Sequence, residues 1–277
     1  MLEFTKMHGL GNDFIIFDGI NQNLPNHNEL AKKVCDRHFG IGADGMMVVK
    51  RSSNSDIKML FYNADGSQAP MCGNGIRCFA KYVFDKKLVK NKEFEVETLA
   101  GIMRPRIMSS EEKISFVEVN LGKAYFSPKI IHANTDKEKI LDESIEIDGN
   151  IFRISAVVVG SVHAVIFVDD LDKIDINVIG CKIENHQLFS NKINVNFCKI
   201  IDNTNLQVLT WERGVGQTLA CGTGAASAAV ISNILYNTSK KVKVHLLGGT
   251  VEIEQRNNEV FMTGPAEIIC QGVYYDK

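Results

Sequence analysis

Short runs of β-branched and aromatic residues recur along the whole chain, and clusters of Gly, Asn, Asp and Ser separate them. Such apolar runs between turn residues are typical of strands joined by tight connections. On this basis we predict strands at 14–17, 57–62, 94–98, 152–159, 165–168, 206–211 and 242–247.

Helical patterns are fewer, and we predict helices at 28–38, 76–84 and 225–236. The first begins at Asn28, a residue type that caps helices, and carries Leu30, Ala31 and Val34 at helical spacing. The other two are apolar around most of their circumference, which is usual for a buried helix. The expected fold class is therefore α+β, with two strand-rich, barrel-like units that each wrap around a central helix.

A short motif occurs twice and indicates how the chain is divided. Cys72-Gly73-Asn74-Gly75 precedes the second predicted helix, and Cys221-Gly222-Thr223-Gly224 precedes the third, 149 positions later. We expect two pseudo-symmetric domains with the two cysteines facing each other. The chain contains no low-complexity segment or long linker, so the boundary is placed near residues 120–123.

Composition narrows the class of protein further. The 277 residues are 45% hydrophobic and 23% charged, with a formal net charge of −2, values typical of a soluble globular protein. The near-neutral charge argues against a nucleic-acid partner, which usually selects a basic surface. No apolar run approaches the roughly 20 residues that span a bilayer, and the N-terminus does not resemble a secretory signal. We therefore expect a cytoplasmic protein with no membrane partner.

The seven cysteines are an odd number and are scattered along the chain, which argues against a disulfide framework. No Cys-x-x-Cys pair is present, so no structural zinc or other metal site is expected. We expect four of them to be small buried hydrophobic residues: Cys35, Cys181, Cys198 and Cys270.

Cys72 and Cys221 differ from the others because glycines follow them at the predicted start of a helix. Glycine leaves backbone N–H groups accessible, and a helix N-terminus carries unsatisfied donors and a partial positive charge. Such an end binds a carboxylate and lowers the pKa of a nearby thiol. Two such sites could remove an α-proton with one thiolate and return a proton from the other thiol. The motif pair thus predicts an amino-acid racemase or epimerase.

The surrounding sequence resembles a known family. Asn63-Ala64-Asp65-Gly66-Ser67, followed after four residues by Cys72-Gly73-Asn74-Gly75-Ile76-Arg77, is similar to the signature of diaminopimelate epimerases. Further matching stretches lie at 7–14, 37–45, 211–214 and 220–224. The resemblance implies an isomerase that needs no cofactor and interconverts LL- and meso-diaminopimelate, in the synthesis of lysine and peptidoglycan precursors. Members of this kind include homodimers, so a homodimer is one expected state.

The family fold implies an active site in the cleft between two similar domains, 1–120 and 121–262, with the C-terminal segment 263–277 completing the first. The resemblance also implies roles for individual residues. Those expected around the reacting carbon are Asn12, Gly73, Asn74, Gly222 and Thr223. Those expected at the distal headgroup are Asn63, Ser161, Asn194, Glu212 and Arg213. His163 and Glu212 are expected to modulate the protonation of the sulfurs.

Two positions depart from the family pattern, namely Ser161, where Asn is usual, and Gln217, where Glu is usual. The substrate could therefore be another amino acid, such as histidine, handled by the same two-cysteine chemistry. Proline-type racemases also use two cysteines, but the Asn-x-Asp-Gly-Ser motif and Glu212-Arg213 argue against that assignment. Phenazine-biosynthesis-like isomerases lack the cysteine pair. A redox-sensing or binding module is the alternative outside the enzymes. No nucleotide-binding glycine motif and no residue set for pyridoxal phosphate is present.

Overall fold

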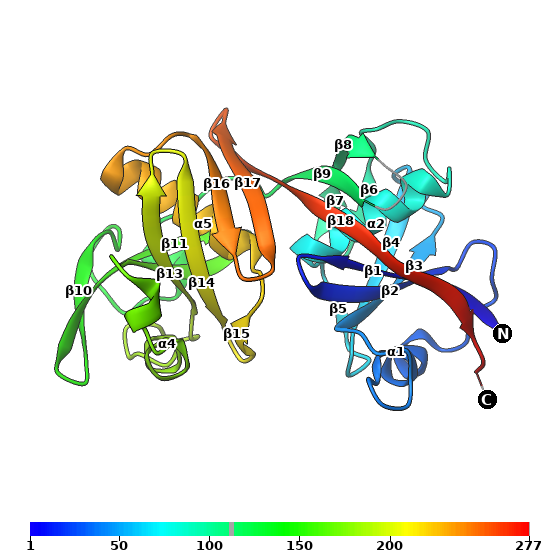
Figure 1. Cartoon of the computed structure of the whole chain (residues 1–277), viewed down its shortest axis with the longest axis horizontal. Coiled ribbons are helices and arrows are strands. Elements are labelled where there is room, and N and C mark those ends of the chain that lie inside the picture. The colour runs from blue at the N-terminus through cyan, green and yellow to red at the C-terminus, as the bar shows by residue number, and fades with distance from the viewer. Residues whose placement is uncertain (111–113, 277) are drawn as a thin grey trace. The chain divides into compact units, whose positions relative to one another are not determined.

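The computed structural model describes residues 1–110 and 114–276. The chain divides into two compact units: unit 1 comprises Met1–Asn120 and Thr263–Lys277, and unit 2 comprises Leu121–Met262. Lys277, the last residue of the predicted C-terminal segment, lies outside the described residues. Both units are rich in strands, and each contains a helix packed among them (Figure 1). The predicted α+β fold with two strand-rich units is confirmed.

Unit 1 is built around a curved sheet in the order β8-β9-β18-β1-β2-β3-β4-β6-β7, with the short β5 added on β4. The long strand β18 returns the end of the chain to this sheet by pairing antiparallel with β1. The bounds are β1 Leu2–Gly9, β2 Asn12–Asp18, β3 Gly45–Lys50, β4 Ile57–Asn63, β5 Gln68–Ala69, β6 Val96–Thr98, β7 Gly101–Met103, β8 Arg106–Ser110, β9 Ile114–Asn120 and β18 Glu259–Tyr274.

Unit 2 contains a sheet in the order β10-β11-β12-β13-β14-β16-β17, with β15 added on β14. The bounds are β10 Glu143–Ile147, β11 Asn150–Val159, β12 Ser161–Phe167, β13 Asn194–Asp202, β14 Asn205–Glu212, β15 Gly216–Thr218, β16 Lys241–Leu246 and β17 Gly249–Arg256.

The two units repeat one topology. In unit 1, β1 pairs antiparallel with β2, β2 parallel with β3, β3 antiparallel with β4, and β4 parallel with β6. The strands β11, β12, β13, β14 and β16 follow the same sequence of pairings in unit 2. A helix follows the second strand of each set, and another follows the short added strand. Registers in one unit can therefore be matched residue by residue with those in the other.

The central helices are α2 (Gly73–Asp85) in unit 1 and α5 (Gly222–Tyr236) in unit 2. α2 packs on β1, β2, β8 and β9, whereas α5 packs on β11, β12, β13, β14, β16 and β17. Both are buried over most of their length, as their largely apolar sequences require. Each has a cysteine as its N-cap, and each begins three residues before the predicted start, at 73 in place of 76 and at 222 in place of 225.

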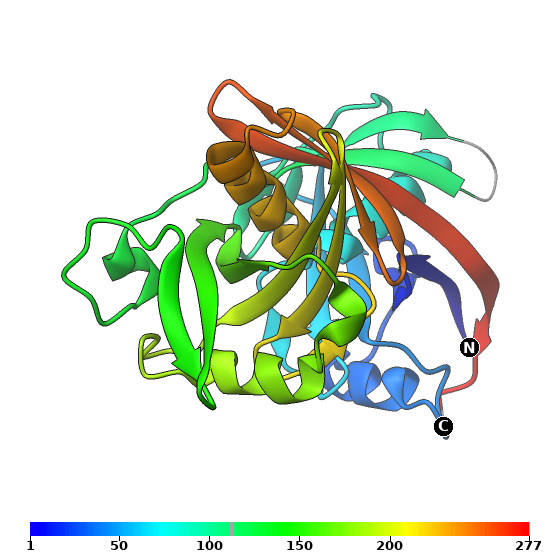
Figure 2. The same ribbon diagram turned by 60° about the vertical axis from the view of Figure 1, so that its left-hand side comes forward.

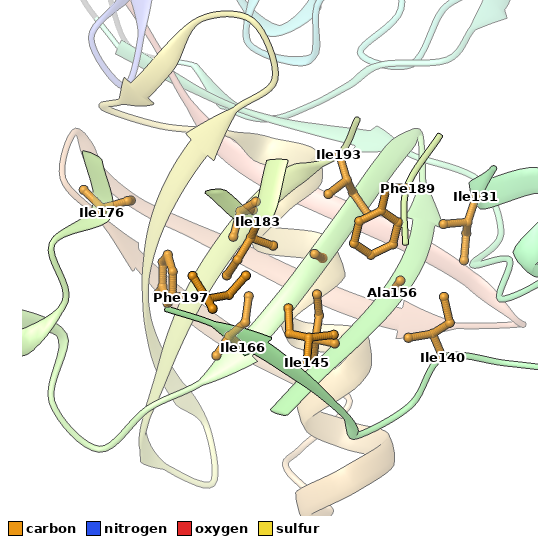
Figure 3. Packing of buried hydrophobic residues seen from close by; sticks show 14 of the residues in the cluster. Ile131, Ile140, Ile145, Ala156, Ile166, Ile176, Ile183, Phe189, Ile193 and Phe197 are labelled. Carbon is orange, nitrogen blue, oxygen red and sulfur yellow. The ribbon is translucent and has the colours of Figure 1, made fainter. Parts of the chain in front are cut away.

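The outer helices are α1 (His27–Cys35) and α4 (Ile176–Glu184); the shorter helical segments are α3 (Pro128–Ile131) and a 3₁₀ turn at Leu171–Lys173. In unit 2, α4 packs through Ile183 on an apolar cluster that includes Ile166 and Phe197 (Figure 3). That cluster contains no residue of α5, so the two helices use different faces of the same strands (Figure 2). Because side chains alternate along a strand, the other face of β12 and β13 is turned to α5.

Two expectations about cysteines are wrong. Cys35 and Cys198 are buried as expected, but Cys181 and Cys270 are exposed, since each lies on the outward side of its element. Among residues 1–110 and 114–276, no helix has the length and apolar character needed to cross a bilayer.

Candidate active site

Cys72 is the N-cap of helix α2, directly before its first residue, Gly73. Its extended backbone (φ −132°, ψ 127°) lets the chain enter the helix, and its side chain makes no capping hydrogen bond. The Cys72 Sγ lies 3.6 Å from Asn12 Oδ1, and Asn74 Nδ2 lies 3.5 Å from the same oxygen. Asn12 opens β2 directly after Leu10 and Gly11, which both have positive φ. Unit 1 thus brings Asn12, Cys72, Gly73 and Asn74 together.

A network of charged residues fixes the position of the Asn12 side chain. Its Nδ2 donates to Asp44 Oδ2 at 2.6 Å, and Asp44 accepts from Arg37 at 2.8 Å. The neighbouring Asp13 forms ion pairs with Arg37 and Lys6 at 2.9 and 3.0 Å. Burial alone would raise the pKa of Asp13, but the hydrogen bonds and charges of Arg37 and Lys6 outweigh it and lower that pKa. Asn12 is therefore tied to an ionised network.

Arg77 fixes the first turn of α2, a role that the sequence analysis did not assign. The side chain is fully buried, and its guanidinium donates to Asn74 Oδ1 at 3.0 Å, the Gly73 carbonyl at 3.2 Å and the Pro265 carbonyl of β18 at 3.2 Å. Burial lowers the pKa of Arg77, while the thiols of Cys78 and Cys72 act in the opposite sense. The signal in the sequence was its place inside the first cysteine motif.

Cys221 occupies the same position in unit 2, as the N-cap of α5, again without a side-chain capping bond. Its Sγ lies 3.5 Å from Thr223 Oγ1. Thr223 Oγ1 is 2.9 Å from His163 Nε2 and 3.1 Å from Ser161 Oγ, and Ser161 Oγ is 2.8 Å from the same imidazole nitrogen. Three polar groups thus converge beside the thiol.

His163 is completely buried on β12. Burial, with a smaller contribution from the positive charge of Arg213, lowers its pKa to about 3. The imidazole is therefore neutral at physiological pH. It contacts Cys221 through Thr223, an indirect arrangement for a residue expected to influence the sulfurs.

Glu212, at the end of β14, reaches Cys221 directly. Its carboxylate accepts from Thr218 Oγ1 at 2.7 Å and is hydrogen-bonded to the Cys221 side chain. Burial raises the pKa of Glu212, and the bonds to Thr218 and Cys221 partly offset that rise. A half-buried carboxyl next to a thiol can accept the thiol's hydrogen bond.

Three of the residues expected at a distal headgroup lie at strand ends or directly after one. Asn194 Oδ1 accepts from the Arg213 backbone N–H at 2.8 Å, and the Arg213 guanidinium donates to the Asn191 carbonyl at 2.9 Å. Both are within unit 2 and adjacent to Glu212. Asn63 is an exposed residue at the end of β4 in unit 1, where its Nδ2 donates to Ser67 Oγ at 3.0 Å. Ser161, expected in the same group, instead contacts His163 and Thr223.

Glu184, the last residue of α4, supports the turn that carries Arg213, and sequence analysis missed it. Its buried carboxylate accepts from Trp211 Nε1 at 2.7 Å and from the Gly214 N–H at 3.1 Å. These bonds bracket Glu212 and Arg213 on both sides. A lone Glu at the end of an apolar segment gave no signal, because its partners lie 27 and 30 residues away in the sequence.

Comparison with known proteins identifies the group to which these features belong. The family model for diaminopimelate epimerase matches residues 4–127 and 155–269. The chain belongs to the diaminopimelate epimerase family. The resemblance expected from the sequence motifs is thereby confirmed.

Individual members of the diaminopimelate epimerase family match over nearly the full length. The diaminopimelate epimerase of Alkaliphilus metalliredigens (strain QYMF) is 48% identical over 275 residues, which cover 99% of this chain and 97% of the relative. That of Caldanaerobacter subterraneus subsp. tengcongensis is 46% identical over 272 residues, 98% of each chain. A solved PhzF-family phenazine biosynthesis protein of Bacillus anthracis has a TM-score of 0.72 over 98% of each chain at 14% identity, a likeness of fold alone.

Proposed function

We propose that this chain is an isomerase that interconverts LL- and meso-diaminopimelate without a cofactor, in the route to lysine and peptidoglycan precursors. One thiolate, from Cys72 or Cys221, removes the α-proton, and the other thiol delivers a proton to the opposite face of the carbon. The proposal is carried by one observation: both units of this member of the diaminopimelate epimerase family place a cysteine at the start of the central helix. Each cysteine begins the buried central helix of a topologically equivalent unit, next to a polar cluster.

The two helix starts supply the electrostatics of this reaction. In both helices the capping position is occupied by a cysteine that makes no side-chain capping bond. The substrate α-carboxylate can take the place of that cap, bound by backbone N–H groups of Gly73 and Asn74 and of Gly222 and Thr223. As the proton leaves, negative charge spreads into the carboxylate, where helix dipoles and N–H donors stabilise it.

The distal headgroup is assigned to residues at strand ends and to Arg213, which follows β14. Arg213 can bind a carboxylate through its guanidinium fork, and Glu212 can accept from an ammonium. Asn194 supports this assignment because it holds the Arg213 backbone. Asn63 belongs to the same proposed group. The small Ser161 side chain contacts His163 and Thr223, so its expected contact with the distal headgroup would require a change of partners.

The remaining parts of the proposal concern assembly and compartment. We place the enzyme in the cytoplasm, with a small-molecule amino-acid substrate as its partner and with no nucleic-acid or membrane partner. A homodimer is the proposed assembly, and light scattering of the purified protein would test it by mass against the 30.8 kDa chain.

Exchange of the substrate α-proton tests the function. Reduced protein in heavy water, without added cofactor, should abolish the α-proton NMR signal of diaminopimelate but not that of other amino acids, histidine included. Cys72→Ser and Cys221→Ser should each reduce the rate at least ~100-fold. Cys181→Ser and Cys270→Ser, at exposed positions, are the matched controls and should retain it.

The alternatives predict other results. Exchange of histidine or another amino acid in place of diaminopimelate would move the enzyme to a different racemase, with Ser161 as the first residue to examine. Absence of any exchange by the reduced protein would overturn the enzymatic assignment.

A further inference from the structure

The equivalent interiors of the two units differ in polarity at three matched positions. The registers of β2–β3–β4 and β12–β13–β14 pair Phe14 with His163, Met47 with Asn196, and Phe61 with Thr210. All six side chains are at most 6% exposed. In unit 1 the two phenylalanine rings pack edge to face at 6.0 Å, so the fold accepts an apolar cluster at this place. The polar set in unit 2 is not demanded by the fold.

The polar set is a connected chain of hydrogen bonds. Thr210 Oγ1 donates to Asn196 Oδ1 at 2.9 Å, and Asn196 Nδ2 lies 2.9 Å from the Ala164 carbonyl and 3.0 Å from His163 Nδ1. Helix α5 packs closely against these hydrogen-bonded side chains, because a Cβ on Gly224 would come within 2.2 Å of Asn196 Oδ1. The amide of Asn196 is therefore confined by contacts with β12, β14 and α5.

This confinement determines which nitrogen of His163 carries the proton. The Ala164 carbonyl can only accept a hydrogen bond, so the amide nitrogen of Asn196 must face it. The same nitrogen faces His163 Nδ1 and can only donate, so Nδ1 must be the unprotonated acceptor. In a neutral imidazole the proton then lies on Nε2, the atom that faces Ser161 and Thr223.

We propose that Asn196 is a positioning residue that holds His163 in the Nε2–H form and thereby directs the Thr223 hydroxyl hydrogen toward the Cys221 sulfur. The inference rests on the proposed function, because it concerns the protonation of a proposed catalytic thiol. With Nε2–H donating to the oxygens of Ser161 and Thr223, and the Ser161 hydroxyl donating to Thr223 Oγ1 at 3.1 Å, the hydroxyl hydrogen of Thr223 is left to point at Cys221 Sγ, 3.5 Å away.

The opposite tautomer would reverse this direction. A proton on Nδ1 would leave a lone pair on Nε2, which would accept the hydroxyl hydrogen of Thr223 and withdraw it from the sulfur. In the Nε2–H form, one hydrogen-bond donor and one hydrogen-bond acceptor contact the Cys221 side chain. Thr223 donates to the thiolate, and the Glu212 carboxylate accepts from the thiol. A residue that is base in one reaction direction and acid in the other needs both.

The tautomer can be measured in the unaltered protein, independently of any activity. In a ¹⁵N-histidine-labelled sample, multiple-bond proton–nitrogen correlation distinguishes a protonated ring nitrogen from an unprotonated one. The signals of His163 among the seven histidines are identified by their loss in His163→Gln. We expect protonated Nε2 and unprotonated Nδ1 at neutral pH. A proton on Nδ1 in the wild-type protein overturns the proposal, whereas a failure of the proposed function would appear only in the exchange assay.

A variant then connects the tautomer with turnover. Asn196→Asp places a carboxylate at Nδ1, so we expect a proton on Nδ1 and a fall in kcat of ~10-fold or more. Thr238→Val is the matched control, because it deletes a buried hydroxyl that bonds Ser232 at 2.8 Å elsewhere in unit 2. It should keep the wild-type tautomer and kcat. Equal loss of kcat in both variants, with His163 unchanged in both, would assign Asn196 a structural role only and overturn the proposal.

Discussion

Removal of the Glu184 carboxylate should loosen the turn that presents Glu212 and Arg213. The carboxylate is 4% exposed and accepts two hydrogen bonds, from the Trp211 indole and the Gly214 backbone. A hydrogen bond to a charged group contributes ~1.5–3 kcal/mol. The exposed Gly214 N–H can regain a water partner, so the loss comes mainly from Trp211. We expect Glu184→Ala to lower the free energy of unfolding by about 1.5–3 kcal/mol.

The same variant should have a distinct kinetic effect. Since Arg213 is proposed to bind the distal carboxylate, a freed turn weakens substrate binding more than it slows proton transfer. A loss of ~1.4 kcal/mol in that contact corresponds to a tenfold increase in KM. Initial rates of diaminopimelate epimerisation over a range of substrate concentrations separate KM from kcat, and urea unfolding gives the stability.

The matched control removes only the third partner of Glu184. Lys192 lies 3.6 Å from the carboxylate, and its side chain is 56% exposed, so this ion pair is strongly screened. Lys192→Met should cost at most ~0.5 kcal/mol and leave KM unchanged. An equal effect of both variants, or a Glu184→Ala protein with wild-type stability and KM, would refute the assignment of Glu184 to this turn.

Two further predictions concern the interior of unit 2. Gly224→Ala should destabilise by about 1–3 kcal/mol more than Gly75→Ala, its equivalent in unit 1. A Cβ at 224 meets the confined Asn196 amide at 2.2 Å, whereas one at 75 meets the movable end of Met47 at 2.6 Å; equal urea midpoints would contradict this. Because the pKa of folded His163 is lowered to about 3, its contribution to stability is present above pH ~6.5 and declines as pH falls toward 3. The stability difference between wild type and His163→Gln should therefore shrink by up to ~1.4 kcal/mol per pH unit below 6.5, and a constant difference would exclude a neutral buried imidazole.

The sequence predicted those elements whose apolar pattern was unambiguous. The central helices were visible because they are apolar on all sides and follow a repeated cysteine motif, although their first turns were missed. Helix α4 was not predicted, because Ile176-Asn177-Val178-Ile179 reads as a β-branched run. The cap that identifies it as a helix, Asp175 accepting from the Asn177 and Val178 N–H groups at 3.1 and 3.3 Å, is a single residue in the sequence. Packing of Ile183 on the apolar cluster then favours the helix over a strand.

In the candidate site, the buried position of Asn196 could not be predicted for a different reason. Asn196 lies in a strand, Asn194-Val195-Asn196-Phe197, in which a polar residue at every second position usually marks a solvated face. Polar and apolar residues do alternate along β13, but its polar face is turned toward helix α5 and is completely buried at Asn196. Only the partners Thr210, Ala164 and His163, contributed by β14 and β12, show that this face is satisfied internally. Buried polar groups are tolerated only when paired, and an apolar set suffices at the same place in unit 1. A polar set that unit 1 does without agrees with the proposed role of Asn196 in setting the His163 tautomer, and only the registers of both units together reveal it.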